Sequence, residues 1–305
     1  MLKIFLNKDR SHIDDLKYIC EILWIVPYLN DIAFQKINSD ILDTGMYSKL
    51  FFNKDILFKD VSLQECDYSV LPFKYDPSDQ RVIATCSDAA LYGKKVLAMY
   101  NDDIHRKFDL PNNLILFRTS VSRSDITDQE RVFPVPICDH FSGNYECQDS
   151  IGFCGCPYFP NSDRSLNYLR KHTIENIGKY YPTDVIFRSG YAAPELPKFI
   201  ARREYYKNLS DNKFTLCIRG AGNFSYRFYE TLMYGRIPIV LDTDTILPLS
   251  NIVDWDKHII FITDKDIDNI SDIIKSKNIN LMENRKLWED YFSPHGFIKN
   301  IKKFI

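Results

Sequence analysis

The chain has 305 residues, enough for two domains or for one large α/β domain with a substantial core. Hydrophobic residues make up 45% and aromatic residues 14% of it, so the composition excludes extended disorder. The 39 basic and 41 acidic residues nearly cancel, to a net charge of -2 at pH 7. This balance gives no general attraction for nucleic acid or an anionic membrane, and we expect neither as a partner.

The apolar runs and the amino-terminal segment indicate where in the cell the protein is expected to lie. No run approaches the ~20 consecutive apolar residues that span a bilayer, and the densest runs, 237–241 and 259–262, have the length of strands. The first 15 residues carry charges every few positions and lack the hydrophobic core and cleavage site of a signal peptide. The sequence therefore predicts a cytoplasmic protein without a transmembrane segment, whose eight cysteines are reduced thiols.

Four of the cysteines, Cys138, Cys147, Cys154 and Cys156, lie close together in the sequence, with His140 between them. Structural zinc sites use paired ligand sets with CxxC-like spacing, and the C-x8-C-x6-C-x-C pattern is not one. We therefore expect buried thiols and no metal site.

Strand-like and helix-like segments alternate along the first half of the chain. Helices are expected at 14–28 and 77–92, the second followed by Gly93. This alternation is typical of a parallel sheet. The strand-like runs are 68–73, 95–100, 113–120 and 131–137.

After a polar stretch at 142–150 the same alternation begins again, as a Rossmann-like series. We expect an α/β fold with two Rossmann-like domains, residues 1–145 and residues 146–283. The two would face each other across a cleft at the carboxyl ends of their sheets, where open α/β sheets bind ligands. Residues 284–305 are expected to be helical and to pack back across the junction. The expected strands here are 150–155, 184–190, 214–220, 237–242 and 257–262, and the expected helices 164–180, 201–209 and 225–235.

The segment 214–261 has a layout suited to anion binding. A strand ends at Arg219, a turn containing Gly220, Gly222 and Asn223 follows, and a helix begins near Ser225, a residue type favoured as an N-cap. A helix amino terminus after a glycine turn attracts phosphate through its free N–H groups and its dipole.

Three charged residues add to this site. Arg219 and Arg227 can make charge-assisted contacts with phosphate, and Glu230 can accept hydrogen bonds from a ribose diol. Each has a simpler alternative, because the arginines can be surface residues and Glu230 can form a solvated i, i+3 ion pair with Arg227. The combination within one strand–turn–helix unit favours nucleotide binding over these alternatives.

The sequence SYRFYETLMYGRIPIVL, followed by ILPL and IVDW, resembles the signature of the exostosin family of inverting glycosyltransferases, approximately S-F-R-F-x-E-A-L-x-x-G-x-I-P-V, then LPF, then a tryptophan. Upstream, ECDYSVLPFKYD and SIGFCG resemble strands of the same family more faintly. The matching positions are Ser225, Tyr226, Arg227, Phe228, Glu230, Leu232, Gly235, Ile237, Pro238, Leu247, Pro248 and Trp255.

The resemblance implies a GT-B type enzyme in which residues 1–145 bind the acceptor and residues 146–283 bind the nucleotide sugar. Such an enzyme would move xylose, arabinose, galactose or glucuronic acid from a UDP-sugar to a hydroxyl of a glycan acceptor, with inversion and without a metal or other cofactor. Glu230 would hold the ribose, and Arg219, Arg227 and the Ser225 end of the helix the diphosphate. Other expected donor-binding residues are Gly155, Gly220, Gly222, Asn223 and Tyr226. The triplet Asp242-Thr243-Asp244 spells a DxD motif, but we interpret it as a polar loop rather than a manganese site.

Inverting transfer needs a general base from the acceptor side. Asp76 is the first choice because it follows a buried strand; Asp79 and Asp88 are nearby alternatives. Asp139 and His140, at the end of the last strand of the first half, come next.

One further residue and two alternative functions remain to be considered. Arg118 can orient a charged acceptor or donor, or simply pair with an acidic neighbour. The chain can also be a nucleotide-sugar-binding or scaffold protein of the same fold without catalysis. A nicotinamide-dependent dehydrogenase is disfavoured, since no GxGxxG follows an early strand. The chain looks like a minimal cytosolic version of the family, from a bacterium or a large virus.

Overall fold

A computed structural model describes residues 2–6, 58–103, 106–134, 137, 139–158, 164–190 and 193–305. The chain divides into two compact units. The first unit comprises Met1–Cys138, Ile246–Pro248 and Asp290–Ile305, and the second comprises Asp139–Thr245 and Leu249–Glu289. None of the helices in the described part of the chain has the length and apolarity that a membrane-spanning segment requires.

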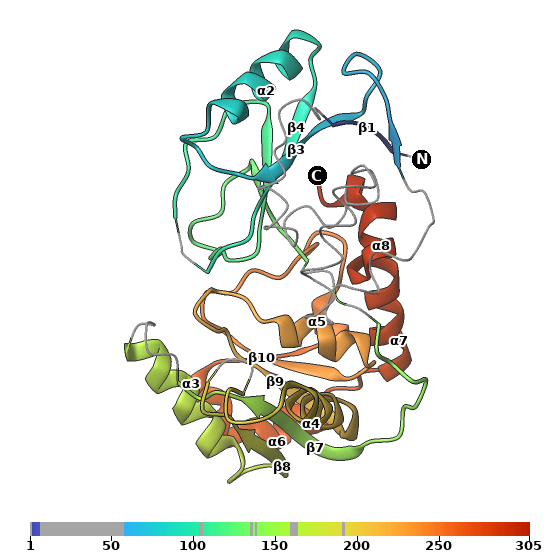
Figure 1. Cartoon of the computed structure of the whole chain (residues 1–305). Coiled ribbons are helices and arrows are strands. Elements are labelled where there is room, and N and C mark those ends of the chain that lie inside the picture. The colour runs from blue at the N-terminus through green and yellow to red at the C-terminus, as the bar shows by residue number, and fades with distance from the viewer. Residues whose placement is uncertain are drawn as a thin grey trace. The chain divides into compact units, whose positions relative to one another are not determined.

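The first unit contains a six-stranded parallel sheet with the strand order β2-β1-β3-β4-β5-β6 (Figure 1). Helix α2 (Gln80–Leu91) buries Val82, Cys86 and Ala89 against alternate residues of β3, β4 and β5. Its amino end is capped by Asp79, which accepts a hydrogen bond from the backbone N–H of Arg81. The strands are β1 (Leu2–Leu6), β2 (Phe58–Asp60), β3 (Tyr68–Lys74), β4 (Lys95–Tyr100), β5 (Leu114–Arg118) and β6 (Glu130–Val132).

The carboxyl-terminal residues complete the first unit. Helix α8 (Pro294–Lys299) is followed by the 3-10 turn η9 (Ile301–Lys303). The ring of Phe297 lies edge-on to Phe117 and Phe133, with centroid distances of 6.0 and 5.4 Å. This aromatic cluster fastens the end of the chain to the β5 side of the sheet.

The second unit contains a five-stranded parallel sheet with the order β11-β10-β9-β7-β8. Its strands are β7 (Gln148–Gly155), β8 (Thr183–Phe187), β9 (Asn212–Cys217), β10 (Ile237–Leu241) and β11 (Ile260–Ile262). Its α-helices are α3 (Arg164–Ile177), α4 (Lys198–Asp211), α5 (Tyr226–Met233), α6 (Ile270–Ser276) and α7 (Leu281–Leu287).

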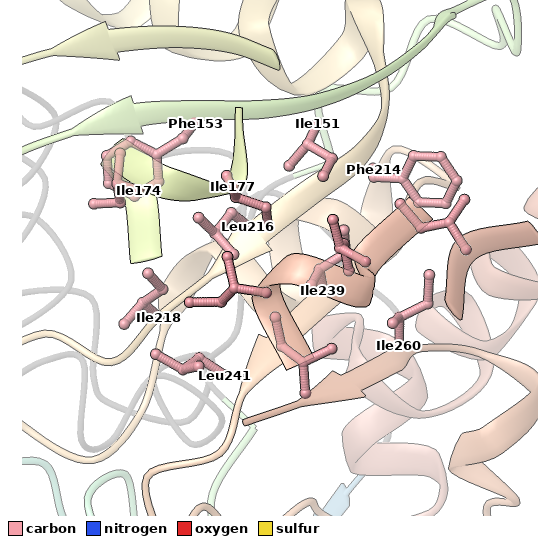
Figure 2. Packing of buried hydrophobic residues seen from close by; sticks show 14 of the residues in the cluster. Ile151, Phe153, Ile174, Ile177, Phe214, Leu216, Ile218, Ile239, Leu241 and Ile260 are labelled. Atoms are coloured by element: carbon pink, nitrogen blue, oxygen red, sulfur yellow. The ribbon is translucent and has the colours of Figure 1, made fainter. Parts of the chain in front are cut away.

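Alternation along the central strands assigns the helices to the two faces of this sheet. Ile151, Phe153, Leu216 and Ile239 belong to a buried apolar cluster that α3 and α6 complete (Figure 2). The residues between them face the other way: a Cβ added to Gly152 would lie 3.0 Å from Oδ1 of Asn208 on α4. Likewise, the Cys217 thiol lies 3.8 Å from the Thr231 hydroxyl on α5. Hence α3 and α6 cover one face, and α4 and α5 the other.

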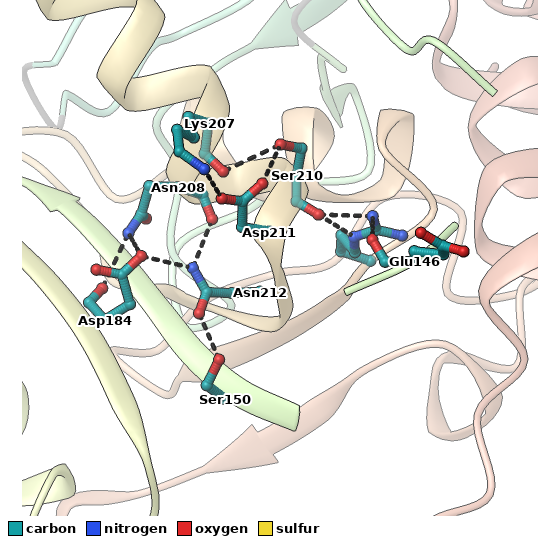
Figure 3. A network of polar contacts seen from close by, with 9 residues as sticks. Glu146, Ser150, Asp184, Lys207, Asn208, Ser210, Asp211 and Asn212 are labelled. Carbon is teal, nitrogen blue, oxygen red and sulfur yellow. Dashed lines mark hydrogen bonds and ion pairs between the residues drawn. The ribbon is translucent and has the colours of Figure 1, made fainter. Parts of the chain in front are cut away.

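A buried asparagine joins the amino ends of three strands (Figure 3). At the start of β9, Asn212 accepts a hydrogen bond from Ser150 at 2.5 Å and donates to Asp184 at 2.9 Å and to the carbonyl of Asn208 at 2.8 Å. The buried amide is therefore satisfied, and this polar network fixes the register of β7, β8 and β9.

The predicted α/β fold class with two parallel sheets is confirmed. The strand expected at 131–137 ends at Val132, and β1 and β2 had not been predicted. The helix expected at 14–28 lies outside the described residues.

The unit boundaries differ from the expected residues. The structure divides the chain between Cys138 and Asp139 rather than after residue 145, and it assigns 284–289 to the second unit and 290–305 to the first. The expected carboxyl-terminal helix is a series of short helical segments that includes a π-turn at Trp288–Phe292. How 284–305 packs relative to both units stays a prediction.

Candidate functional site

The candidate site of the second unit lies where β7, β9 and β10 end. Because the strands are parallel, Gly155, the turn after Cys217 and the loop after Leu241 all lie at the same edge of the sheet. Helix α5 begins at this edge, after Ser225, whose backbone is extended (φ -140°, ψ 121°) and whose side chain makes no capping hydrogen bond. The first turn of α5 therefore lacks its usual side-chain acceptor, which suits it to an anion.

Arg227, in the first turn of α5, is buried at this edge. Its Nη2 donates to the carbonyl of Cys154 at 2.6 Å, and its guanidinium lies 4.5 Å from the ring centroid of Phe153. Among the described residues, its Nε has no hydrogen-bond partner, and no carboxylate forms an ion pair with it within 4.0 Å. A buried guanidinium with an unused donor and no ion-pair partner favours an anionic ligand.

Arg170, which the sequence analysis missed, reaches the same place from α3. Its Nε donates to the carbonyl of Cys156 at 2.9 Å, and its Nη1 donates to the carbonyls of Ile218 and Arg219 at 3.0 and 2.7 Å. Burial and the neighbouring charge of Arg227 lower the pKa of Arg170 to about 9. The two guanidiniums therefore concentrate positive charge at the ends of β7 and β9.

A sequence signal for Arg170 existed. It lies on the buried face of α3 with Asn167, Ile174 and Ile177, at helical spacing. An arginine in such a position needs internal acceptors, and the carbonyls at strand ends supply them.

Glu230 lies one turn after Arg227 and is half-buried. Its Oε2 accepts a hydrogen bond from the hydroxyl of Tyr205 on α4, which the sequence analysis also missed. Burial raises the pKa of Glu230, and the Tyr205 hydrogen bond and the Arg227 charge oppose that rise without cancelling it. The charges of Glu230 and Arg227 interact, but the ion pairs found among the described residues do not include the i, i+3 pair considered as the alternative role.

The turn before α5 is held mainly by its own polar groups. Nη2 of Arg219 donates to the carbonyl of Ala221 at 2.8 Å, and the N–H of Gly220 donates to the carbonyl of Phe224 at 3.3 Å. Gly222 is buried in this turn. The ring of Tyr226 lies edge-on to Phe224, with a centroid distance of 5.2 Å.

Asn223 joins this turn to the loop after β10. Its Nδ2 donates to the carbonyls of Thr243 and Asp244 at 3.1 and 3.2 Å, and its Oδ1 accepts from the Thr243 hydroxyl at 2.9 Å. The side chain thus serves to shape the site, and its expected contact with the donor stays a prediction.

The Asp242-Thr243-Asp244 loop is a tight turn. Oδ1 of Asp242 accepts hydrogen bonds from the N–H groups of Asp244 and Thr245 at 2.9 and 3.3 Å, and Asp244 has a φ of 64°. In the described part of the chain, no group of three or more His, Cys, Asp or Glu side chains is arranged to hold a metal ion.

Asp76 and Asp79, two candidate bases of the first unit, make local hydrogen bonds. Asp76 is exposed after β3 and accepts from the N–H and the hydroxyl of Ser78 at 2.9 and 2.7 Å, which lowers its pKa. Asp79 caps α2 and forms an ion pair with Arg81 at 2.6 Å. Asp88 lies on α2, half-buried. The lowered pKa of Asp76 makes it a weaker base.

Asp139 and His140 belong to the second unit, not to the acceptor-binding part expected from the sequence. Asp139 accepts two hydrogen bonds from Arg285, at 2.9 and 2.5 Å. Burial raises the pKa of Asp139, but the hydrogen bonds and the charge of Arg285 lower it by more. The net shift of this pKa is therefore downward. The His140 ring lies 4.7 Å from the ring of Tyr206. Asp139 is thus paired with Arg285, and the role of either residue as the general base stays a prediction.

Arg118, at the end of β5, is fully buried. Its Nη1 donates to Glu130 at 2.6 Å in an ion pair, and its guanidinium lies 5.1 Å from the ring centroid of Phe108. Of the two roles considered, the structure shows pairing with an acidic neighbour.

Comparison with known proteins agrees with the sequence resemblance. The family described as Exostosin GT47 domain matches residues 158–277. An exostosin-1 homolog of Caenorhabditis elegans is 36% identical over 75 residues, which are 25% of this chain and 20% of that protein. The probable beta-1,4-xylosyltransferase IRX10 of Arabidopsis thaliana is 29% identical over 126 residues, 41% of this chain and 29% of that protein. The probable glucuronosyltransferase GUT1 of Oryza sativa subsp. japonica is 29% identical over 126 residues, 41% of this chain and 28% of that protein.

The match to each of these three relatives spans less than a third of the relative's own length. The family match over residues 158–277 includes β8, β9 and β10, together with Arg170, Tyr205, Arg227 and Glu230.

Proposed function

We propose that the protein is a glycosyltransferase that moves a sugar from a UDP-sugar to a hydroxyl group of a glycan acceptor, a proposal supported by the match of residues 158–277 to the family described as Exostosin GT47 domain. We further propose that transfer inverts the anomeric centre and needs no metal ion. The donor would bind to the second unit, at the carboxyl ends of β7, β9 and β10.

The observation that carries this proposal is the buried guanidinium of Arg227. It lies at the amino end of α5 beside Arg170, and its Nε has no hydrogen-bond partner among the described residues. A diphosphate placed there would supply the missing acceptor and the missing negative charge at once. The same charges would stabilise the diphosphate as it leaves, which is the task a metal ion performs in other enzymes.

Glu230 suits the ribose end of the nucleotide. Tyr205 donates to its Oε2, and Oε1 remains to accept from a ribose hydroxyl. The donor sugar is proposed from the four candidates of the sequence analysis, xylose, arabinose, galactose and glucuronic acid. Two of the relatives are named as a probable xylosyltransferase and a probable glucuronosyltransferase, which favours xylose and glucuronic acid among these four.

The proposed reaction is a single displacement. The acceptor oxygen attacks C1 of the sugar, the bond from C1 to the β-phosphate oxygen breaks, and UDP leaves with the bonding electrons. The hydroxyl proton passes to a carboxylate, for which Asp76 remains the first choice because it is exposed at the carboxyl end of β3. Asp76→Asn should abolish transfer with UDP binding unchanged, whereas Asp128→Asn, at an exposed position of the same unit, should leave both unchanged.

One observation favours a second candidate, a nucleotide-sugar-binding protein without catalysis. The pKa values of Asp76 and Asp139 are both lowered, and both carboxylates already accept hydrogen bonds. If neither acts as the base, the donor site would bind UDP without transferring a sugar.

The test is a binding and activity panel on the purified chain. Thermal shift and calorimetry with UDP, GDP, CMP, NAD and a set of UDP-sugars, with manganese and with EDTA, should show selective stabilisation by UDP in both conditions. Stabilisation by a UDP-sugar followed by transfer to a glycan acceptor supports the transferase, and binding without transfer or hydrolysis supports the second candidate. Stabilisation by NAD, or by no nucleotide, would contradict both.

A further inference from the structure

Tyr205 lies next to two charged side chains of the candidate donor site, Glu230 and Arg227. Its hydroxyl, on α4, donates a hydrogen bond to Oε2 of Glu230, on α5. The guanidinium of Arg227 lies 5.7 Å from the centroid of its ring and 4.5 Å from that of Phe153. One tyrosine therefore links the carboxylate and the cation, from a helix that lies outside the strand–turn–helix unit.

The hydrogen bond restricts Glu230 in two ways. A glutamate side chain has three rotatable bonds, and an anchored Oε2 limits the directions in which Oε1 can point. In addition, a donor to the carboxylate stabilises its charged form against the burial that opposes ionisation. Burial and the Glu230 charge raise the pKa of Tyr205 well above 10, so the phenol keeps its proton over the working pH range.

We propose that Tyr205 is a positioning residue of the donor site: it holds Glu230 ionised and oriented, so that Oε1 receives a hydroxyl of the nucleotide ribose. This inference rests on the proposed function, because it concerns the same nucleotide. If Tyr205 only joined α4 to α5, its removal would not change the recognition of the ribose. A positioning role predicts that it does.

The groups that face Glu230 define its pH response. They are Tyr205 from α4, Arg227 from α5, Tyr234 at the end of α5 and Cys217 from β9. The Tyr205 hydrogen bond and the Arg227 charge lower the pKa of Glu230. Without the Tyr205 hydroxyl, the pKa of Glu230 rises further. As the pH is lowered, UDP affinity should therefore begin to fall at a higher pH than in the unmodified protein.

The test compares UDP with its analogue lacking both ribose hydroxyls, by calorimetry from about pH 5 to pH 9. The variants are Tyr205→Phe, Glu230→Gln, the double variant, and the control Tyr168→Phe at an exposed position of α3. We expect Tyr205→Phe to weaken UDP binding about tenfold, the typical effect of a lost hydrogen bond to a charged group. Its preference for UDP over the analogue should shrink by a similar factor, and the control should change nothing.

The double variant separates positioning from a general structural effect. If Tyr205 acts through Glu230, then Tyr205→Phe costs little further affinity in the Glu230→Gln background. Additive losses, or a Tyr205→Phe protein with an unchanged UDP preference and pH profile, would overturn the inference while leaving the donor site intact. Absence of UDP binding in the unmodified protein would overturn the proposed function together with it.

Discussion

A Cβ atom added to Gly155 would lie 2.8 Å from Nη2 of Arg227. That nitrogen donates to the carbonyl of Cys154, so the end of β7 is shaped to receive this guanidinium. Because residue 155 has no side chain, an arginine from α5 can lie across the end of β7. In the sequence, 71 residues lie between Gly155 and Arg227.

Gly155→Ala should displace Arg227 without unfolding the protein. The new methyl group meets the far end of a flexible side chain rather than backbone, so the guanidinium can swing away at small cost. We expect UDP affinity to fall about tenfold, as for the loss of charge-assisted hydrogen bonds, with little change in melting temperature. Gly190→Ala, where a Cβ would make ordinary contacts at 3.5 Å, is the control. Unchanged UDP affinity in Gly155→Ala would refute this role of residue 155.

Arg227→Lys should weaken UDP binding although the charge is kept. An ammonium group cannot bind the Cys154 carbonyl and direct a second donor at a phosphate as the guanidinium fork does. A loss of roughly 10- to 100-fold in the calorimetric association constant is expected. Arg203→Lys, at an exposed position of α4, should bind UDP normally. Equal affinity in both variants would show that Arg227 contributes only charge or packing.

Glu230→Gln should stabilise the protein at neutral pH while weakening UDP binding. Because burial raises the pKa of Glu230 in the folded state above the value of 4.5, keeping its charge at pH 7 costs stability, and an amide removes that cost. The gain should vanish as the pH falls below about 4.5, where both the folded and unfolded protein carry a protonated Glu230. Urea unfolding at pH 7.5 and pH 4 measures it, with exposed Glu283→Gln as the control. If Glu230→Gln were less stable than the unmodified protein at pH 7.5, the predicted gain in stability would be wrong.

Asp139→Asn should lower stability and leave UDP binding unchanged. The variant loses part of the two-bond pair with Arg285, worth about 1 kcal/mol once the 45% exposure of the Asp139 side chain is taken into account. Because its pKa is lowered from 3.8, this contribution is complete above that pH and disappears as the pH falls through the folded-state value. Urea unfolding at pH 7 and pH 3 tests this, with Asp272→Asn on α6, 86% exposed, as the control. Loss of sugar transfer with normal stability would instead make Asp139 the base.

The amino-acid sequence by itself determined the local elements of the second unit. Strand-like runs around 150–155 and 237–242 correspond to β7 and β10, and the helix expected at 225–235 is α5, which begins after Ser225. Such elements follow from the period of apolar residues and from turn and cap residues, which act within a few positions. The same local signals gave the resemblance that the family match confirms.

Only the tertiary structure decided which distant residues meet at the site. Arg170 reaches the carbonyl of Ile218 because β7 and β9 are neighbours although β8 lies between them in the sequence. Tyr205 meets Glu230 because α4 and α5 cover the same face of the sheet. Strand order and helix placement depend on burying the whole apolar surface at once, a property of the complete chain that no local pattern encodes.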